Sequence, residues 1–395
     1  MPVVGTDRDA LPRDVLGWLD ERAEQRRAAG LRRALRPRTP VAAAIDLASN
    51  DYLGLVRHPE VIDGATAALR RWGAGSTGSR LVTGTTTEHE LLEAELAEFV
   101  GAESGLVFAS GYAANLGVVT ALSDRDTLIV SDAGCHASLV DACRLSRARV
   151  VVTPHADTAA VAAALAARSE RRALVLTDSV FSADGDLAPL HDLHRVCREH
   201  GALLVVDEAH AIGVRGDGGR GWVHEQGLAG QHDVVVTATL SKSLAAQGGV
   251  VLAGARVRAH LIDVARTFIF DTGLAPAAVG AARAALGVLR REPQRAGAVL
   301  ARAADLARMS GLDVVPESAV VSVVLGDPQR AYDASVACLE RGLHVGCFRP
   351  PSVPAGTSRL RLTARANLGA DEMATVEAVL TDVLSQARAA TGVPA

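Results

Sequence analysis

Three short apolar runs near the middle of the chain end in side chains that can do acid–base or nucleophilic chemistry. They are followed by Asp178 and Ser182 in "VLTDSVFSADGD", by Asp207 and His210 in "LLVVDEAHAIG", and by Thr239 and Lys242 in "VVVTATLSK". In open α/β sheets, ligands bind at the carboxyl ends of the strands. If the runs are neighbouring strands, a carboxylate, an imidazole and an amine converge on one ligand. Separate solvated loop residues explain any one pair, but they explain the set less well because each pair directly follows an apolar run.

Lys242 is the only lysine among the 41 lysines and arginines of the chain. In an arginine-rich coding background, a lysine needed only for its charge can drift to arginine. Arginine cannot replace lysine where a deprotonated amine is required, because a guanidinium keeps its proton. The composition therefore marks Lys242 as a candidate for chemistry, with a chance survivor on a solvated face as the alternative.

These groups together suit pyridoxal phosphate (PLP). This cofactor needs a lysine amine, a carboxylate facing its pyridine nitrogen, and donors for its phosphate. Gly111, in "FASGYAANLG", lies at a strand-to-helix junction, where backbone N–H groups bind phosphate well. His136, in "SDAGCHASLVDA", could stack on the ring, although a lone histidine is more simply explained as a partly buried structural residue.

The elements that must position these residues are alternating strands and helices. Short apolar runs predict strands at 105–110, 127–132, 149–153, 172–178, 202–208, 233–239 and 249–254. Several runs are apolar at both odd and even positions, as expected for strands covered on both faces. With helices at 59–72 and 87–101, the alternation predicts an α/β fold with a large, mostly parallel sheet.

The remaining segments predict an arm and a second domain. Residues 11–35 predict an arginine-rich amphipathic helix or arm, and a long helix over 275–291 leads out of the large domain. Further strands at 319–326, 343–348 and 359–364, mixed with helices, predict a smaller α+β domain. We therefore divide the chain into an N-terminal helical arm at 1–45, a large PLP-binding domain at 46–285 and a small C-terminal domain at 286–395.

Bulk composition limits the classes of function. The 395 residues carry a net charge of −4, so we expect no general nucleic-acid or anionic-membrane surface. No apolar run reaches transmembrane length, and the N-terminus is charged early without an apolar signal core, so we expect a cytoplasmic protein. Five cysteines without a C-x-x-C pair predict free thiols.

Longer segments around these residues resemble a known family, the α-oxoamine synthases, which are fold-type I PLP enzymes. The resemblance covers nearly the whole chain and is carried by "LASNDYLGL", "GSRLVTG", "SGYAANLG", "CHASLVDA", "TDSVFSADGD", "VVDEAHAIG", "TLSK" and "RPPSVPAGTSRLRLT". It implies a PLP-dependent transferase fold of type I, PLP as cofactor, and a homodimer in which both domains and two subunits build each site.

The resemblance also implies roles at the cofactor. Lys242 would bind the cofactor aldehyde and later take the substrate Cα proton. Asp207 would pair with the pyridine nitrogen and His210 with the ring hydroxyl. His136 would stack on the ring and polarise a thioester carbonyl.

Further implied roles concern the phosphate and the substrates. Gly111, Tyr112 and Thr239 would hold the phosphate, with Ser182 near the ring hydroxyl or the phosphate. Arg361 resembles the arginine that holds the amino-acid carboxylate. Positions that touch the acyl substrate are matched by Arg32 and Ser352, with Asn50 and Arg349 as further candidates.

Within the family, "CHASLVDA" and "GSRLVTG" favour the member that condenses L-alanine with a pimeloyl thioester, on coenzyme A or a carrier protein, in biotin synthesis. The alternatives are glycine with acetyl-CoA or succinyl-CoA, and serine with a long acyl-CoA. The arginine-rich N-terminal segment either docks an acyl carrier protein or packs on the second subunit, and both readings stay open.

The chain departs from the family after Lys242, where "SLAAQGG" replaces a stretch in which relatives usually carry an additional glycine. We therefore expect a stiffer start to a helix after the lysine. Asp178 stands where some relatives have glutamate, and Ser352 stands where threonine is common.

Two other patterns have competing explanations. "GAGSTG" (73–78) and "GDGGRG" (216–221) match the dinucleotide-binding motif G-x-G-x-x-G, but the first follows a helix and the second an acid-and-histidine loop. The i, i+3 spacing in "HDLHRVCREH" resembles metal ligands, although zinc sites on one helix more often use i, i+4 pairs. We therefore favour a solvated helix face over a metal site for His191, His194, Cys197 and His200.

Overall fold

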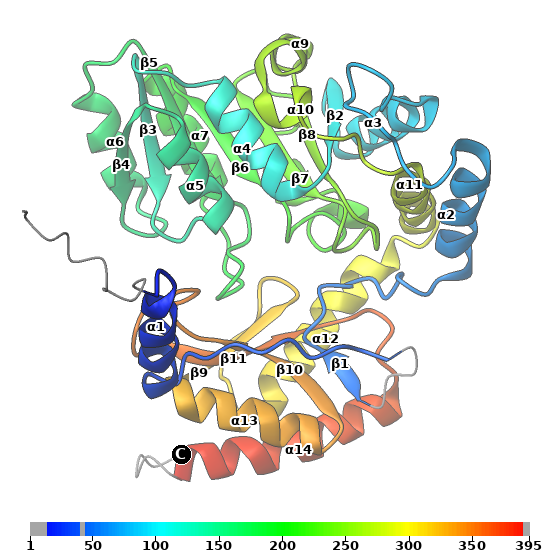
Figure 1. The fold of residues 1–395 in the computed structure, drawn as a ribbon, viewed down its shortest axis with the longest axis vertical. Coiled ribbons are helices and arrows are strands. Elements are labelled where there is room, and N and C mark those ends of the chain that lie inside the picture. The colour runs from blue at the N-terminus through cyan, green and yellow to red at the C-terminus, as the bar shows by residue number, and fades with distance from the viewer. Residues whose placement is uncertain (1–13, 40–43, 390–395) are drawn as a thin grey trace, which may run out of the picture.

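The computed structural model describes residues 14–39 and 44–389. These residues form two layered parts, each built on its own sheet (Figure 1). Helix α11 (Pro276–Arg291) lies in the larger part, and α12 (Gln294–Met309) continues the chain into the smaller part. The long helix predicted at 275–291 is α11.

The larger sheet has seven strands in the order β2-β8-β7-β6-β5-β3-β4. Their bounds are β2 Ser104–Phe108, β3 Thr127–Asp132, β4 Arg149–Thr153, β5 Arg172–Asp178, β6 Leu203–Asp207, β7 Val234–Thr239 and β8 Gly249–Ala253. The neighbours from β7 to β4 are parallel, whereas β8 is antiparallel to both β2 and β7. The predicted large, mostly parallel sheet is confirmed.

Helices cover both faces of this sheet because alternate strand residues enter two cores. In β6, Leu204 and Val206 pack with one set of helices, whereas Val205 packs with the other. The first set is α3 Thr87–Val100, α6 Thr158–Ala166 and α7 Leu190–Glu199; the second is α4 Gly111–Ala121, α5 Ala137–Leu145, α9 Ala255–Val264 and α10 Arg266–Ile269. Helix α2 (Pro59–Trp72) packs against α11. Burial on both sides explains why the runs are apolar at both odd and even positions.

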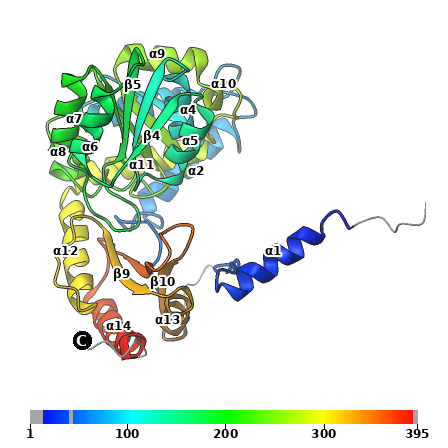
Figure 2. The ribbon, with the colours of Figure 1, turned by 90° about the vertical axis from the view of Figure 1, so that its left-hand side faces the viewer.

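The smaller sheet has four strands in the order β1-β10-β11-β9. Their bounds are β1 Ile45–Leu47, β9 Val320–Gly326, β10 Leu343–Phe348 and β11 Ser358–Thr363. Strand β1 is parallel to β10, and the other neighbours are antiparallel. Helices α12, α13 (Pro328–Glu340) and α14 (Ala370–Ala389) pack in this part (Figure 2). The small sheet therefore includes a strand from the N-terminal side of the chain, while the division into 1–45, 46–285 and 286–395 stays a prediction.

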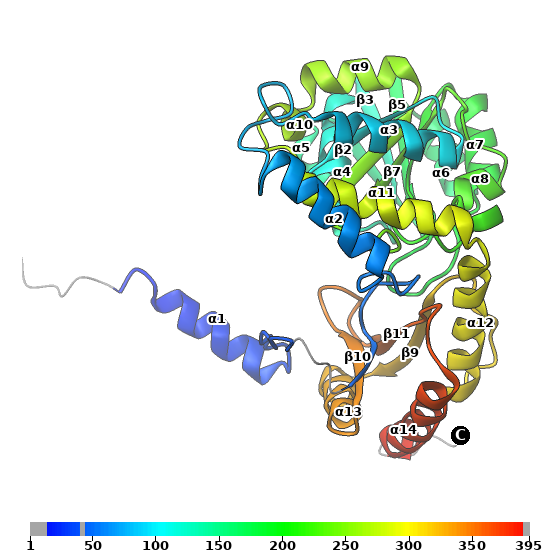
Figure 3. The ribbon, with the colours of Figure 1, turned by 90° about the vertical axis from the view of Figure 1, so that its right-hand side faces the viewer.

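Helix α1 (Gly17–Ala28) is the described helix of the N-terminal arm predicted at 1–45, of which residues 1–13 and 40–43 lie outside the described residues. None of its residues is buried. It projects away from both sheets (Figures 2 and 3). The apolar side chains near its start, Leu16, Trp18 and Leu19, are exposed.

Two short elements connect β6 to β7, namely the 3₁₀ helix η1 (Asp217–Gly219) and α8 (Trp222–Glu225). Among the helices that the structure describes, none combines the length and the apolar character needed to cross a membrane.

Candidate active site

The ends of three neighbouring strands bring the predicted acid, histidine and lysine segments together. Asp178, at the end of β5, lies opposite Asp207, at the end of β6. Asp207 lies opposite Thr237 in β7, three residues before the turn that leads to Lys242. Because these strands are parallel, their carboxyl ends share one edge of the sheet. We call Asp178, Asp207, His210 and Lys242 the strand-end group.

Asp207 is fixed by two donors. The Asn115 side chain donates to its Oδ2 over 2.7 Å, and the Ala209 N–H donates to its Oδ1 over 2.9 Å. Asn115 also donates to Ser138 Oγ (2.8 Å) and accepts from Thr237 Oγ1 (2.6 Å). A carboxylate has about four lone-pair sites, so Asp207 can still accept from a ligand. Sequence reasoning missed Asn115, whose signal is a polar residue inside the apolar helical stretch "GYAANLG".

Lys242 lies in a turn between β7 and β8, and no helix starts after it. The expected helix start is wrong, because residues 243–248 form turns and bends that lead directly into β8. Burial lowers the pKa of Lys242; Asp207 and Asp178 oppose this effect, and Arg361 adds to it. A lowered pKa increases the fraction of neutral amine that can act as nucleophile or base.

Ala245 gives the departure after Lys242 a physical consequence. Its φ is 51°, in the left-handed region that favours glycine. A residue with a Cβ atom loses about 1–2 kcal/mol in that region. The Ala245 N–H donates to the Lys242 carbonyl over 2.9 Å, so the strained residue closes the turn that presents the lysine.

His210 belongs to a buried hydrogen-bond chain. Its Nδ1 lies 2.5 Å from Tyr52 Oη, and Tyr52 Oη also donates to Asn50 Oδ1 over 3.2 Å. Burial lowers the pKa of His210 well below its ordinary value, and the neighbouring Lys242 and Arg361 lower it further. A neutral imidazole bonded at Nδ1 keeps Nε2 for a ligand. Tyr52 lies in the quoted motif "LASNDYLGL", but sequence reasoning selected only Asn50.

Arg361 brings the smaller sheet to this edge of the larger one. It lies in β11 and is only 3% exposed. Its guanidinium donates to the Ser182 carbonyl (2.7 Å), to Asn50 Oδ1 (3.0 Å) and to Thr363 Oγ1 (3.1 Å). Through Asn50 it joins the chain that ends at His210. The two sheets therefore meet through residues that the sequence predicts for the site.

His136 caps the start of α5. Its Nδ1 lies 2.7 Å from Ser138 Oγ, and its backbone N–H donates to Asp178 Oδ1 over 3.2 Å. Partial burial lowers the pKa of His136, Asp207 raises it, and Lys242 lowers it. Burial, and next to it the charge of Asp207, raises the pKa of Asp178 well above its ordinary value. His136 is therefore within electrostatic reach of the strand-end group.

Gly111 and Thr239 lie together where the sequence predicts the phosphate. Gly111 is the first residue of α4, whose N-cap Ser110 accepts from the Ala113 N–H over 3.0 Å. A Cβ atom at Gly111 would come 3.1 Å from Thr239 Cβ, so glycine allows this close approach of helix start and strand end. Thr239 Oγ1 also lies 2.7 Å from Ser241 Oγ. The first N–H groups of a helix have no partner within the helix, so this junction can bind an anion.

Tyr112 follows Gly111 at the same helix start. Its hydroxyl donates to Asp141 on α5, and this bond raises the pKa of the phenol. The Tyr112 side chain is thus committed to α5, and what Tyr112 offers an anion is its backbone N–H.

Comparison with known proteins identifies the family. The family model for class I and II aminotransferases matches residues 42–380. Two relatives called 8-amino-7-oxononanoate synthase are 70% identical over 94% of this chain: one from Mycolicibacterium vanbaalenii, covered over 97% of its length, and one from Mycolicibacterium gilvum, covered over 98%. A solved structure of serine palmitoyltransferase from S. paucimobilis, with a bound PLP–myriocin aldimine, gives a TM-score of 0.88 at 30% identity, over 95% of this chain and 100% of that one. The chain belongs to the α-oxoamine synthases.

As an α-oxoamine synthase, the chain is a PLP-dependent acyltransferase of fold type I. The side chains at the sheet edge fit this cofactor. Lys242 supplies the one ε-amine of the sequence, Asp207 keeps lone pairs for a ring nitrogen, and His210 keeps Nε2. The start of α4, with the Thr239 hydroxyl beside it, fits a phosphate. The donor and acceptor set supports the roles expected of these residues, which stay predictions.

Of the four residues that this α-oxoamine synthase is predicted to use for its acyl substrate, Asn50 bonds Arg361, whereas Arg32, Arg349 and Ser352 lie elsewhere. Arg349 donates to the carbonyls of Gly30 and Arg32, so it ties the end of the arm to the loop after β10. Ser352 lies in the same loop, and its N–H donates to the Arg349 carbonyl over 3.0 Å. Arg32 and Ser352 are exposed. Across residues 14–39 and 44–389, no hydrogen bond joins Arg32, Arg349 or Ser352 to Lys242.

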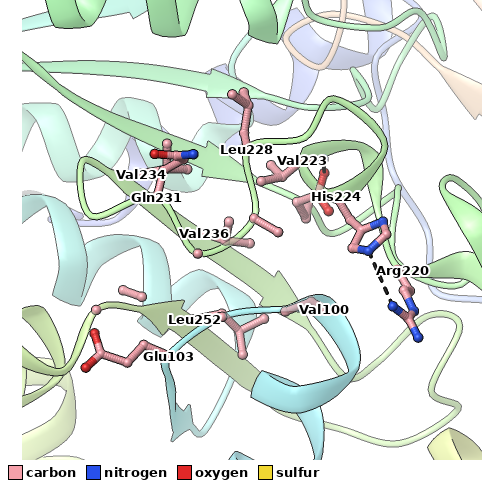
Figure 4. Close-up of a pocket in the computed structure, with 16 residues that line it drawn as sticks. Val100, Glu103, Arg220, Val223, His224, Leu228, Gln231, Val234, Val236 and Leu252 are labelled. Carbon is pink, nitrogen blue, oxygen red and sulfur yellow. Dashed lines mark hydrogen bonds between the residues drawn. The ribbon is translucent and has the colours of Figure 1, made fainter.

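A small cavity lies behind the site, on the face of the sheet that α3 covers, and none of the predicted site residues lines it. Figure 4 shows its lining, to which Arg220 and His224 contribute. Glu208, which directly follows β6, also lines the cavity and accepts from the N–H groups of Trp222 and Val223 (3.0 Å each). Burial raises the pKa of Glu208 to about 7. The cavity is therefore distinct from the strand-end group, although Glu208 adjoins it in sequence.

The two glycine-rich motifs and the histidine-rich helix lie in other parts of the fold. "GAGSTG" lies between α2 and α3, and "GDGGRG" lies in the loop that contains η1. On α7, His191 is exposed, but the solvated-face interpretation is wrong for His194, which is buried and bonds Asp233 (3.0 Å), and for Cys197, which lies in the core. Among the described residues, no three His, Cys, Asp or Glu side chains are grouped to hold a metal ion.

Proposed function

We propose that this chain condenses L-alanine with a pimeloyl thioester, with loss of carbon dioxide, to give 8-amino-7-oxononanoate for biotin synthesis. The observation that carries the proposal is the 68–70% identity, over 94–95% of the chain, to proteins called 8-amino-7-oxononanoate synthase. The meeting of Lys242, Asp207 and Arg361 at one sheet edge supports it.

Lys242, Asp207, His210 and His136 would hold PLP in this proposal. Lys242 Nζ would bind the aldehyde carbon, Asp207 the pyridine nitrogen, and His210 the ring hydroxyl. His136 would lie against the ring face. The bound cofactor supplies an electron sink for the negative charge that develops at the substrate Cα.

Phosphate binding is assigned to the start of α4 and the end of β7. The N–H groups of Gly111 and Tyr112 and the hydroxyl of Thr239 would donate to the phosphate, with Ser182 near the ring hydroxyl or the phosphate. The positive end of the α4 dipole supports this assignment.

We assign Arg361 to bind the carboxylate of L-alanine and so to orient the substrate. Arginine pairs with carboxylates through two parallel hydrogen bonds, which fixes the direction of the bound group. Lys242 then takes the Cα proton, and its lowered pKa supplies the neutral amine that this step needs.

We assign to His136 a hydrogen bond to the thioester carbonyl oxygen while the new bond forms. The alanine Cα attacks the thioester carbon, the C–S bond breaks, and the thiol leaves. The alanine carboxylate then leaves as carbon dioxide, and Lys242 returns a proton to the carbon that carried it. Arg32 and Ser352, with Asn50 and Arg349, are assigned to the acyl chain.

The alternative is another reaction of the same family, with glycine and acetyl-CoA or succinyl-CoA, or with serine and a long acyl-CoA. The solved serine palmitoyltransferase structures share only about 30% of their sequence with this chain. The much higher identity of the 8-amino-7-oxononanoate synthases favours alanine and a pimeloyl donor.

We also propose that the protein works as a homodimer in the cytoplasm. Exposed apolar side chains at Leu81, Val82 and Phe270, and an α1 helix without buried residues, suit a subunit interface. The arm either packs on the second subunit or docks an acyl carrier protein. Deletion of residues 1–39 separates the two: loss of dimers in light scattering favours packing, and loss of activity with the carrier-protein donor alone favours docking.

A substrate panel tests the proposed reaction. L-Alanine, glycine and L-serine are each assayed with acetyl-, succinyl-, pimeloyl- and palmitoyl-CoA, and L-alanine is also assayed with pimeloyl-carrier protein. The expected result is the highest kcat/KM for L-alanine with a pimeloyl thioester. A different best pair would overturn the named reaction and leave the family assignment intact.

A further inference from the structure

One histidine outside the predicted site is held between two carboxylates. His155 Nδ1 lies 3.0 Å from Asp132 Oδ1, and His155 Nε2 lies 2.7 Å from Asp186 Oδ2. The imidazole packs edge-on against the Phe181 ring, with ring centroids 4.2 Å apart. Both ring nitrogens are therefore used, and both face acceptors that carry negative charge.

The first carboxylate belongs to the loop that carries His136. Asp132 ends β3, and its Oδ1 also accepts from the Gly134 N–H over 2.6 Å. Its Oδ2 accepts from the Ala156 N–H over 2.7 Å. Asp132 thus fixes the short turn that runs from β3 to His136 at the start of α5.

The second carboxylate belongs to the loop that supports Arg361. Asp186 lies four residues after Ser182, whose carbonyl accepts from Arg361 Nε. The loop is closed on itself, because the Phe181 N–H donates to the Asp186 carbonyl over 3.0 Å. Asp186 and the carbonyl that holds Arg361 therefore belong to the same hydrogen-bonded loop.

The smaller sheet grips the same loop from its other side. Arg359 on β11 is paired with Asp184, and Ser318 Oγ donates to the Gly185 carbonyl over 2.8 Å. The loop at 181–187 is thus one part of the large domain that the small domain holds, and His155 links this loop to the His136 turn.

We propose that His155, in its doubly protonated form, is a positioning residue that holds the 132–136 turn and the 181–187 loop together, and so sets His136 and Arg361 for the amino-acid substrate. The proposal rests on the proposed function in assigning L-alanine to Arg361. The charged groups that face the imidazole are Asp132, from the end of β3, and Asp186, from the loop. Loss of one proton leaves a donor for only one of them.

Its pH dependence has a definite sign. Partial burial lowers the pKa of His155, but the hydrogen bonds to Asp132 and Asp186 outweigh burial and raise it above 6.5. The doubly bonded form is therefore fully present below 6.5 and is lost as the pH rises through the pKa of the folded protein. The His155 side chain is 42% exposed, so it exchanges protons with solvent without unfolding.

The test measures amino-acid affinity without any acyl donor. L-Alanine, and in parallel glycine and L-serine, are titrated into PLP-loaded wild type and His155→Gln, followed by the visible absorbance of the cofactor over roughly pH 5.5–9. Glutamine donates from a single amide nitrogen, and its other polar atom is an acceptor oxygen, so it does not replace the two separate donor nitrogens of the imidazole. His191→Gln, on the exposed face of α7, is the matched control.

We expect the Kd of His155→Gln for L-alanine to exceed that of wild type by about 3- to 10-fold at low pH. The ratio of the two Kd values should fall towards 1 above the pKa of His155. His191→Gln should give a ratio near 1 throughout. Equal affinities for wild type and His155→Gln at low pH, or a ratio that does not change with pH, would overturn the proposal.

A second variant keeps the test decisive if His155→Gln fails to fold. In Asp186→Asn, the amide oxygen can still accept from His155 Nε2, but one of the two negative charges beside the imidazole is lost. The pKa of His155 should therefore fall, and L-alanine binding by this variant should show its pH dependence at lower pH than binding by wild type. An unchanged pH profile would contradict the proposal. Product assays with pimeloyl thioesters test the proposed function separately, so either claim can fail while the other stands.

Discussion

The two ends of the proposed site differ in how the chain holds them. At the cofactor end, Asp207, His210 and Arg361 are buried, and side-chain hydrogen bonds fix each of them. At the acyl end, Arg32 and Ser352 are exposed, and the contacts of this region run through backbone carbonyls. Within one chain, the residues predicted for the cofactor are buried and hydrogen-bonded, whereas Arg32 and Ser352, predicted for the acyl substrate, are exposed.

The difference follows from where the residues lie. The cofactor end is built where parallel strands of a buried sheet finish, so register brings Asp178 and Asp207 together, and Arg361 joins them from the smaller sheet. The acyl end is built from a projecting arm and a loop, which have no such frame. Changes at the two ends should accordingly differ in size and in which substrate they affect.

The largest effect is expected at Lys242. Lys242→Ala should lower turnover by about 10³-fold or more, because it removes both the amine that binds the cofactor and the base at the substrate Cα. Lys242→Arg should fail similarly, since a guanidinium does not give up its proton. Steady-state assays and circular dichroism check the result, and near wild-type turnover by either folded variant would refute the role of Lys242.

The next largest effect is expected at Glu208, whose titration should make the free energy of unfolding depend on pH. Burial raises the pKa of Glu208 from 4.5 to about 7, so its contribution to stability is full below 4.5 and is lost as the pH rises to about 7. Glu208→Gln keeps the acceptor for Trp222 and Val223 without the titration. Relative to this variant, the free energy of unfolding of wild type should fall by as much as about 3 kcal/mol between these pH values.

Urea unfolding at a fixed protein concentration measures this difference. Glu199→Gln, at an exposed position of α7, is the control. The difference in free energy of unfolding between this variant and wild type should not change between the same pH values. Parallel stability–pH curves for wild type and Glu208→Gln would show that the buried carboxyl does not titrate in this range.

A pair of arginines compares the two ends directly. Arg361→Gln should raise the KM for L-alanine by about 10- to 100-fold, because it removes a buried charged donor. Arg349→Gln should leave the KM for L-alanine within about 2-fold and act mainly on the KM for the acyl donor. Arg361→Lys, which keeps the charge but not the fork, should fall between wild type and Arg361→Gln. Equal effects of Arg361→Gln and Arg349→Gln on both substrates would remove the distinction between the two ends.

The smallest effect is expected in the turn after Lys242. Ala245→Gly should raise the free energy of unfolding by about 0.5–1 kcal/mol, since glycine tolerates the positive φ at this position. Ala246→Gly is the matched control: its φ is not positive, so it should be destabilising. Denaturant midpoints compare the two variants, and a loss of stability in both would mean that the turn is not strained at Ala245.

Much of the fold follows from sequence because two-sided burial leaves a clear pattern. Apart from the largely exposed edge strand β4, the strands of the large sheet are buried and apolar at both odd and even positions; Asp207 ends such a run, and Lys242 follows another by three residues. Asn115, Tyr52 and His155 were not predicted, since their importance comes from partners distant in sequence. The helix expected after Lys242 fails for a related reason: residues 243–248 are committed to turns between two strands, which overrides local preference.

Lys242, the lone lysine, is proposed to be the residue that binds the cofactor. The direct measurement is borohydride reduction of the PLP-loaded protein, followed by peptide mass mapping. We predict a single reduced cofactor on the peptide that contains Lys242, and none on Lys242→Ala, whose sequence has no other lysine to replace it. Attachment at another position in wild type, or equal labelling of Lys242→Ala, would contradict the claim.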